Sequence, residues 1–287
     1  MNSSPECFDC GQKQCERVVE LCGGGEEIRQ QVRERLEKMK PELDLSAPPS
    51  TYTAQMLIAT MELLGKRDPF RSIREEQNCR AQEWAERYDA ALERCPEPLK
   101  TALALAAAGN VIDVGPRYQF DPEATLSRCR FAHDDSGLLF ERLKRARRLV
   151  YILDNAGEAL FDRLVLKRLG VQEPTIVARS TPILNDLTVD EARQLGFERF
   201  GRVIGTGSPY LGIDLASVSQ EFLQAYYRAD VVIAKGHANF ESLVDDGRDG
   251  FYLLTAKCEL VAQRLGVGLG ESVLYYAGGS DVSRDTN

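Results

Sequence analysis

Acidic and amide side chains follow two apolar segments that have the composition of buried β-strands. Asp154 and Asn155 come directly after the segment 149–153, and Asp186 lies in the polar stretch that follows the segment 175–178. Ligands of open α/β sheets bind outside the carboxyl ends of the strands, so we expect these side chains to meet at one edge. Their oxygens suit a hard divalent cation such as Mg²⁺ or Mn²⁺. The sequence therefore predicts a metal site there.

Two lysines follow later apolar segments of the same kind. The ammonium groups of Lys235 and Lys257 would neutralise negative charge beside the predicted cation, and Asn239 would orient phosphate or substrate hydroxyls. A cation and lysines together can neutralise the charge on the equatorial oxygens of a transferring phosphoryl group. Gly205 and Gly207 would let backbone N–H groups approach an anion, although the third glycine of the dinucleotide fingerprint is absent. The pattern favours phosphoryl-transfer chemistry.

The N-terminal half offers two more candidates and also an alternative. Asn110 and Asp113 follow the apolar segment 99–108, where polar groups are costly unless they are paired, so we expect both to face the substrate. Each polar residue taken singly has a structural alternative: Asp154 and Asp186 would also suit helix N-caps, and the end of the segment 99–108 would suit a C-cap. The convergence of polar residues after five strand-like segments favours a site.

The elements that must position these residues change character near residue 149. The first 147 residues predict helices over 5–21, 26–40, 52–64, 72–92, 99–108 and 136–148. Strands then follow at 149–153, 175–178, 203–204, 231–234 and 251–254, with helices between them and an edge strand at 272–276. Alternating strands and helices indicate a Rossmann-like α/β fold, a doubly wound, mostly parallel sheet. We therefore predict an all-helical N-terminal region (1–147) and an α/β metal-binding domain (148–287).

Composition excludes several classes of protein. The 287 residues carry a net charge of −8, which argues against a nucleic-acid partner. The longest uninterrupted apolar run, 102–108, is too short to span a bilayer, so no membrane partner is expected. The first residues lack the basic and apolar parts of a secretory signal. The expected location is the cytoplasm.

The eight cysteines are poor candidates for disulfides in a cytoplasmic chain of this length. Cys7-x-x-Cys10 alone has ligand or redox spacing, and it lacks a second matching pair. Most of the cysteines therefore read as small buried helix residues. Cys7, Cys10 and Cys258 nevertheless form a candidate thiol site.

Several short motifs together resemble the damage-control phosphatases, a family of metal-dependent enzymes. The resemblance rests on the run 154–158 (Asp-Asn-Ala-Gly-Glu), the Asn-Asp pair at 185–186, Lys-Gly-x-x-Asn at 235–239 and Lys-Cys at 257–258. The N-terminal cysteines and the Gly-Asn-x-x-Asp run at 109–113 resemble the prokaryotic branch. The resemblance spans nearly the whole chain.

This resemblance implies a helical region packed on a Rossmann-like domain, with the cation held by Asp154, Asn155 and Asp186. It makes Lys257 the phosphate contact, and Asp154 and Lys257 the catalytic residues. His237 stands where eukaryotic members have an aspartate that holds a sugar. The implied substrates are small phosphorylated metabolites, such as sugar phosphates or phosphopantetheine derivatives, and Co²⁺ or Ni²⁺ could replace Mg²⁺ or Mn²⁺. A phospho-aspartate at Asp154 is one possible intermediate. We favour direct attack by water instead, because no second aspartate lies two residues after Asp154 to act as its acid–base partner.

Two other functions fit parts of the sequence. An S-adenosylmethionine-dependent carboxyl methyltransferase would use Gly205-x-Gly207 for its cofactor on the same kind of sheet. A non-catalytic metal or metabolite sensor would instead depend on a regulatory thiol site formed by Cys7 and Cys10, with Cys258 as a further candidate. Phosphate release with and without a chelator separates the phosphatase from the first of these. The oligomeric state is left open.

Overall fold

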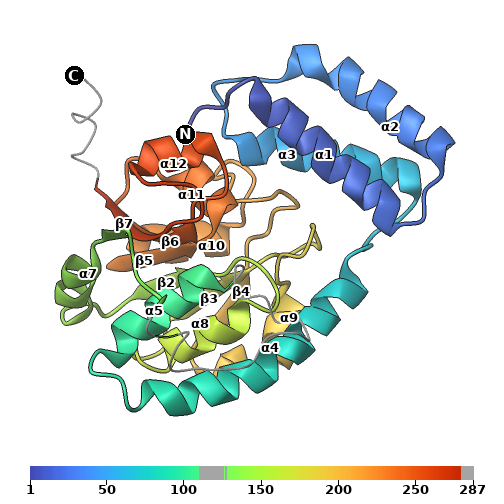
Figure 1. The fold of residues 1–287 in the computed structure, drawn as a ribbon. Helices are drawn as coiled ribbons and strands as arrows, with labels where there is room; N and C mark the ends of the chain where they lie inside the picture. Colours follow the sequence, from blue (N-terminus) through green and yellow to red (C-terminus); the bar gives the residue numbers. More distant parts are fainter. Residues whose placement is uncertain (110–125, 127, 279–287) are drawn as a thin grey trace.

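The computed structural model describes residues 1–109, 126 and 128–278. Within these residues the chain forms a seven-stranded sheet with helices on both faces (Figure 1). None of the described helices combines the length and the apolar character needed to cross a membrane. Asn110 and Asp113 lie outside the described residues, so their predicted roles stay predictions.

The sheet has the strand order β1-β7-β6-β5-β2-β3-β4. All neighbours are parallel except β6 and β7, which are antiparallel. Branched and aromatic side chains dominate the central strands, as expected where both faces are covered. The strands are β1 His133–Asp134, β2 Leu149–Ile152, β3 Thr175–Ala178, β4 Arg202–Gly205, β5 Val231–Lys235, β6 Gly250–Thr255 and β7 Ser272–Ala277.

One face of the sheet is covered by helices from both halves of the chain. Leu103 and Leu105 pack in the same hydrophobic core as Tyr151 of β2 and Phe161. Prolines at the first positions of two N-terminal helices suit their starts, where a backbone N–H has no helical partner. The helices of this face are α4 Arg71–Leu92, α5 Pro98–Ala108, α7 Ser136–Leu143, α8 Ala159–Leu166 and α9 Val189–Gln194.

The other face and the N-terminal helices have cores of their own. Phe222, Phe240 and Val261 carry one core on the second face. Its helices are α10 Gln220–Arg228, α11 His237–Leu243 and α12 Glu259–Leu265. The first helices pack together around Val18 and Leu57 and contact α11 through α3 (Figure 1). They are α1 Glu6–Leu21, α2 Glu26–Met39 and α3 Pro49–Leu64, and two short 3₁₀ helices lie at Lys40–Glu42 and Phe197–Arg199.

The predicted fold class is confirmed: N-terminal helices precede a mostly parallel, doubly wound α/β sheet. The sequence did not indicate the two-residue strand β1 or the antiparallel direction of β7. Because α4 and α5 share a hydrophobic core with β2, residues before 148 cover part of one face of the sheet. The division at 147/148 stays a prediction.

Candidate active site

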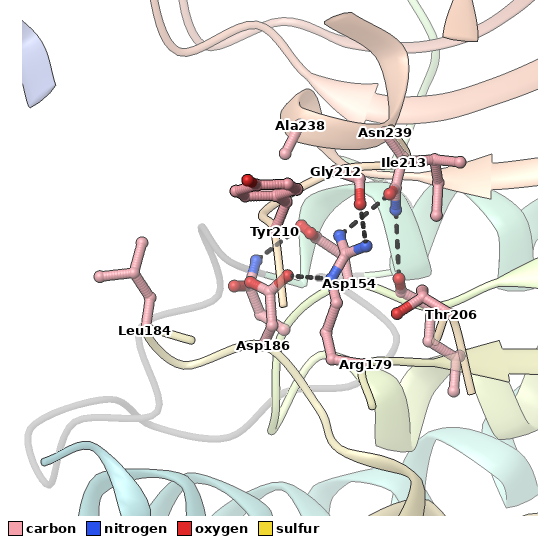
Figure 2. Close-up of polar contacts among 12 residues, drawn as sticks. Asp154, Arg179, Leu184, Asp186, Thr206, Tyr210, Gly212, Ile213, Ala238 and Asn239 are labelled. Atoms are coloured by element: carbon pink, nitrogen blue, oxygen red, sulfur yellow. Dashed lines mark hydrogen bonds and ion pairs between the residues drawn. The ribbon is translucent and has the colours of Figure 1, made fainter. Parts of the chain in front are cut away.

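The loops after β2 and β3 bring two predicted metal ligands, Asp154 and Asp186, together (Figure 2), and the third, Asn155, lies beside them. The backbone N–H of Leu187 donates to the carbonyl of Asp154 over 2.8 Å, and Asn155 pairs with Asp186 as an isolated antiparallel bridge. Ile152 is in register with Val177 on one side and Ala234 on the other, so the chains leave the three strands at the same level. The predicted meeting of acids at this edge is observed.

The two carboxyl groups are buried, and that of Asp154 lies in an environment that disfavours its charged form. Asp154 is 7% exposed and Asp186 is 2% exposed. Burial, followed by the charges of Asp186 and Glu158, raises the pKa of Asp154 to about 8, against the opposing effect of Lys257 and of an arginine described below. The Asn155 amide donates to Asp154 Oδ2 over 2.7 Å. The folded chain therefore assembles more negative charge here than it neutralises.

Gly236 makes room for the Asp154 carboxylate. A Cβ atom at position 236 would lie 2.0 Å from Asp154 Oδ2, which no side chain can tolerate. The residue also has a φ of +80°, in a region that favours glycine. Gly236, which follows β5, thus leaves space for the carboxylate that follows the neighbouring strand β2.

Arg179 organises the site, and the sequence interpretation did not assign it a role. Its Nε donates to Asp186 over 2.6 Å, its Nη1 to the Gly212 carbonyl over 2.6 Å, and its Nη2 to Asn239 Oδ1 over 2.9 Å (Figure 2). The side chain is 2% exposed. The sequence did contain a signal for it, because a cation directly after a buried strand requires a partner.

Asn239 lies at this site with its amide fully committed to the protein. Besides accepting from Arg179, it donates to the carbonyls of Lys235 and Leu153 over 2.7 and 3.2 Å. It is 0% exposed. Its contacts fix the loop after β5, and its predicted contact with substrate stays a prediction.

Lys235 is fully buried and points to the neighbouring helix α8. Its Nζ bonds Glu158 over 2.6 Å and Asp162 over 2.9 Å, and Tyr151 donates to Asp162 over 2.6 Å. The charges of Asp162 and Glu158 outweigh desolvation and raise the pKa of Lys235. In this arrangement the ammonium serves two carboxylates, and the predicted contact with a phosphate is untested.

Replacing Lys235 by methionine should reduce the free energy of unfolding by about 3–5 kcal/mol, because two buried carboxylates would lose their shared counter-charge. Urea unfolding measures the change. The matched control is Lys167→Met, since Lys167 pairs with Asp89 at the surface and should contribute less than about 1 kcal/mol. Equal effects of the two substitutions would contradict the buried ion-pair network.

Lys257 follows β6 and is exposed, unlike Lys235. Its charge opposes the rise in the pKa of Asp154, which places its ammonium in the same electrostatic neighbourhood. Its backbone nitrogen lies 2.8 Å from His237 Nε2. Of the two lysines predicted to contact phosphate, Lys257 is therefore the one that is accessible to solvent and to a substrate.

The three cysteines of the candidate thiol site lie near one another, where α1 begins and α12 begins. Cys10 interacts electrostatically with Cys258 and with Cys7. Among the described residues, no three His, Cys, Asp or Glu side chains form a group suited to a metal ion. The candidate metal ligands at the sheet edge are two carboxylates and one amide. In the described part of the chain the three cysteines do not form part of a group suited to a metal ion.

Comparisons with known proteins agree with this architecture. The family model of the damage-control phosphatase ARMT1-like domain matches residues 3–273. The chain is 35% identical to the damage-control phosphatase PH1575 of Pyrococcus horikoshii, over 93% of this chain and 96% of that protein. It is 29% identical to a damage-control phosphatase of Archaeoglobus fulgidus, over 95% and 98% of the two chains.

A solved structure is similar over the same length. The crystal structure of a DUF89 family protein from Pyrococcus horikoshii has a TM-score of 0.86 and 33% identity, and the match covers 96% of this chain and 99% of that one. The family model and the names of the two curated relatives support a hydrolase of the phosphatase class with a damage-control role. The chain therefore belongs to the damage-control phosphatase ARMT1-like family.

Proposed function

We propose that this chain is a metal-dependent phosphomonoesterase that hydrolyses small phosphorylated metabolites. One observation carries the metal dependence: the balance of buried charge at the sheet edge. Four buried carboxyl groups, those of Asp154, Glu158, Asp162 and Asp186, face two buried cations, Lys235 and Arg179. Full ionisation leaves two negative charges without a partner. One divalent cation would neutralise them.

The donor chemistry also fits such a cation. Asp154, Asn155 and Asp186 offer carboxylate and amide oxygens, which Mg²⁺ and Mn²⁺ prefer, with Co²⁺ and Ni²⁺ as further candidates. When bound, the cation would act as a Lewis acid toward phosphoryl oxygens. Two of these three residues are already held: the Asp186 side chain by Arg179, and the Asp154 main chain by its bond to Leu187.

The chain's own side chains would complete the phosphate site. Lys257 would neutralise charge on the phosphoryl oxygens, since its ammonium is exposed and acts on Asp154. Asp154 is the acidic group that we place toward the phosphorus-bearing part of a substrate, because its carboxylate packs against Gly236 within reach of the charge of Lys257. His237 contacts the Thr255 carbonyl, and it offers a substrate no carboxylate at that position. The proposed substrates are therefore those that do not need such a carboxylate, among sugar phosphates and phosphopantetheine-like compounds.

A panel of phosphorylated metabolites, assayed with each of Mg²⁺, Mn²⁺, Co²⁺ and Ni²⁺, tests the proposal. We expect phosphate release that EDTA abolishes and that excess cation restores. Full activity after complete chelation would contradict the metal dependence. Methyl transfer from S-adenosylmethionine, without phosphate release, would favour the methyltransferase instead.

Cation binding should depend on pH because Asp154 must lose its proton first. With the pKa of Asp154 raised to about 8, the apparent affinity should fall about tenfold for each pH unit below 8. In the metal-free protein, a folded-state pKa above the unfolded value near 3.8 gives stability at low pH that is lost as pH rises toward 8. Added Mn²⁺ should therefore raise the Tm more at pH 8.5 than at pH 6, as differential scanning fluorimetry would show. A pH-independent shift would contradict a protonated Asp154.

A further inference from the structure

The loop that carries Asp186 is attached to the N-terminal helices. Ile183, three residues before Asp186, is buried in the hydrophobic core of these helices, and Leu184 packs against the same core. Leu184, which lies on the same loop as Asp186 (Figure 2), has a φ of +47°, a left-handed conformation that is costly for a residue with a side chain. Contacts from outside the loop must therefore hold this segment in its conformation.

Arg74, near the start of α4, provides such contacts. Its Nη1 donates to the Leu184 carbonyl over 3.3 Å, and its Nε donates to Glu191 over 2.7 Å. Nη1 and Nη2 also bond the two oxygens of Asp68 over 2.9 and 2.7 Å. Arg74 is 2% exposed, and the paired bonds to one carboxylate fix the plane of its guanidinium. The donor to Leu184 is therefore held in one orientation.

The bonds of Arg74 reach the chain on both sides of Asp186. Leu184 lies two residues before Asp186 in the sequence. Glu191, the other partner, accepts from the backbone N–H and the hydroxyl of Thr188, two residues after Asp186, over 2.9 and 2.7 Å. One buried side chain of α4 thus braces the whole turn that presents the Asp186 carboxylate.

The same helix also contacts the other ligand loop, which begins at Asp154. One turn after Arg74, the side-chain oxygen of Asn78 accepts from the Gly157 N–H over 2.7 Å. Gly157 has a φ of +74°, and a Cβ atom there would lie 3.1 Å from the Cβ of Gln77. A glycine at this position lets the loop lie directly against α4.

We propose that Arg74 and Asn78 are positioning residues that hold the two ligand loops at the spacing that the proposed cation requires. Both act through the loop backbone. The loops are also bonded to each other, by the Ala156 N–H and the Asn185 carbonyl over 2.8 Å, so loosening one from α4 should loosen the other. The consequence for cation binding rests on the proposed function, whereas the attachment of the loops to α4 does not.

Hydrogen exchange followed by mass spectrometry tests the attachment in the metal-free protein. In Arg74→Met we expect the amides of residues 183–188 to exchange about tenfold faster, while those of β5 and β6 exchange as in the wild type. Isothermal titration should show a Mn²⁺ affinity that is lower by about 10- to 100-fold, as for other groups that orient metal ligands. Arg71→Met is the matched control on the same helix. The Arg71 side chain is 75% exposed and pairs with Glu75, so its loss should change neither measurement.

Three further variants separate positioning from general stability. Arg74→Lys keeps a positive charge beside Asp68 and Glu191, but one ammonium cannot reproduce the bonds of the guanidinium fork, so Mn²⁺ affinity should still fall. Asn78→Leu should speed exchange of residues 154–158. Asn78→Asp, whose carboxylate can still accept from the Gly157 N–H, should return that exchange toward the wild-type rate.

Two results would overturn the proposal. One is exchange that rises equally over the whole chain, or stays unchanged at 183–188, in both Arg74 variants, because Arg74 would then support only the fold. The other is wild-type Mn²⁺ affinity in folded Arg74→Met. A wild-type protein that binds no Mn²⁺ would instead contradict the proposed function, and the exchange rates would still decide whether α4 positions the loops.

Discussion

Replacing Asp154 by asparagine should abolish phosphate release, with a loss of at least about 10³-fold in kcat/KM, and yet leave the metal-free protein at least as stable as the wild type. The first effect follows because the carboxylate is the central ligand of the proposed cation. The second follows because Asp154 ionises at a cost: burial and two neighbouring acids raise its pKa to about 8. An amide of the same shape avoids that cost.

Three measurements separate these effects. Steady-state kinetics gives the loss of activity, isothermal titration with Mn²⁺ gives the loss of affinity, and thermal unfolding at pH 8.5 gives the stability. Asp190→Asn is the matched control, since the Asp190 carboxylate is 89% exposed and should contribute to none of the three. Retained Mn²⁺ affinity in Asp154→Asn would place the metal site elsewhere.

The parts of this site that follow from strand order were predictable. Apolar segments such as 149–153 and 175–178 mark parallel strands, and their carboxyl ends must share an edge, so the meeting of Asp154 with Asp186 follows from topology. Helix positions were predictable for a different reason: amphipathic spacing and prolines mark them locally. The strand at 272–276 was predicted, but its edge position was wrong, because β7 lies between β1 and β6. Its antiparallel direction depends on the path of the loop before it, which local composition does not specify.

The partners of buried charges were not predictable. Lys235 and Arg179 both occupy strand ends, but their partners come from helix α8 and from loops far along the chain. Composition shows that such a cation needs an acid and not which acid supplies it. Glu158 illustrates the point: it was recognised only within a motif, and the structure shows that it bonds Lys235 and acts on Asp154.

Arg179→Met should have the other large effect, because one side chain holds three segments of the site. We expect kcat/KM to fall about 10³-fold and the free energy of unfolding to fall by about 3–5 kcal/mol, since Asp186 would be left buried without a counter-charge. Arg179→Lys keeps the charge but cannot reproduce bonds to Asp186, Gly212 and Asn239 together, so it should lose activity with a smaller loss of stability. Kinetics and urea unfolding measure both.

A double variant distinguishes a positioning role for Arg179 from a purely structural one. Arg179→Met with Asp186→Asn removes both charges of the pair, so much of the lost stability should return, whereas activity should not. If activity returned with stability, Arg179 would only support the fold and Asp186 would not be a ligand. If neither returned, the bonds to Gly212 and Asn239 would matter more than the ion pair. The cycle therefore tests whether the charge that Arg179 neutralises is the same charge that the proposed cation uses.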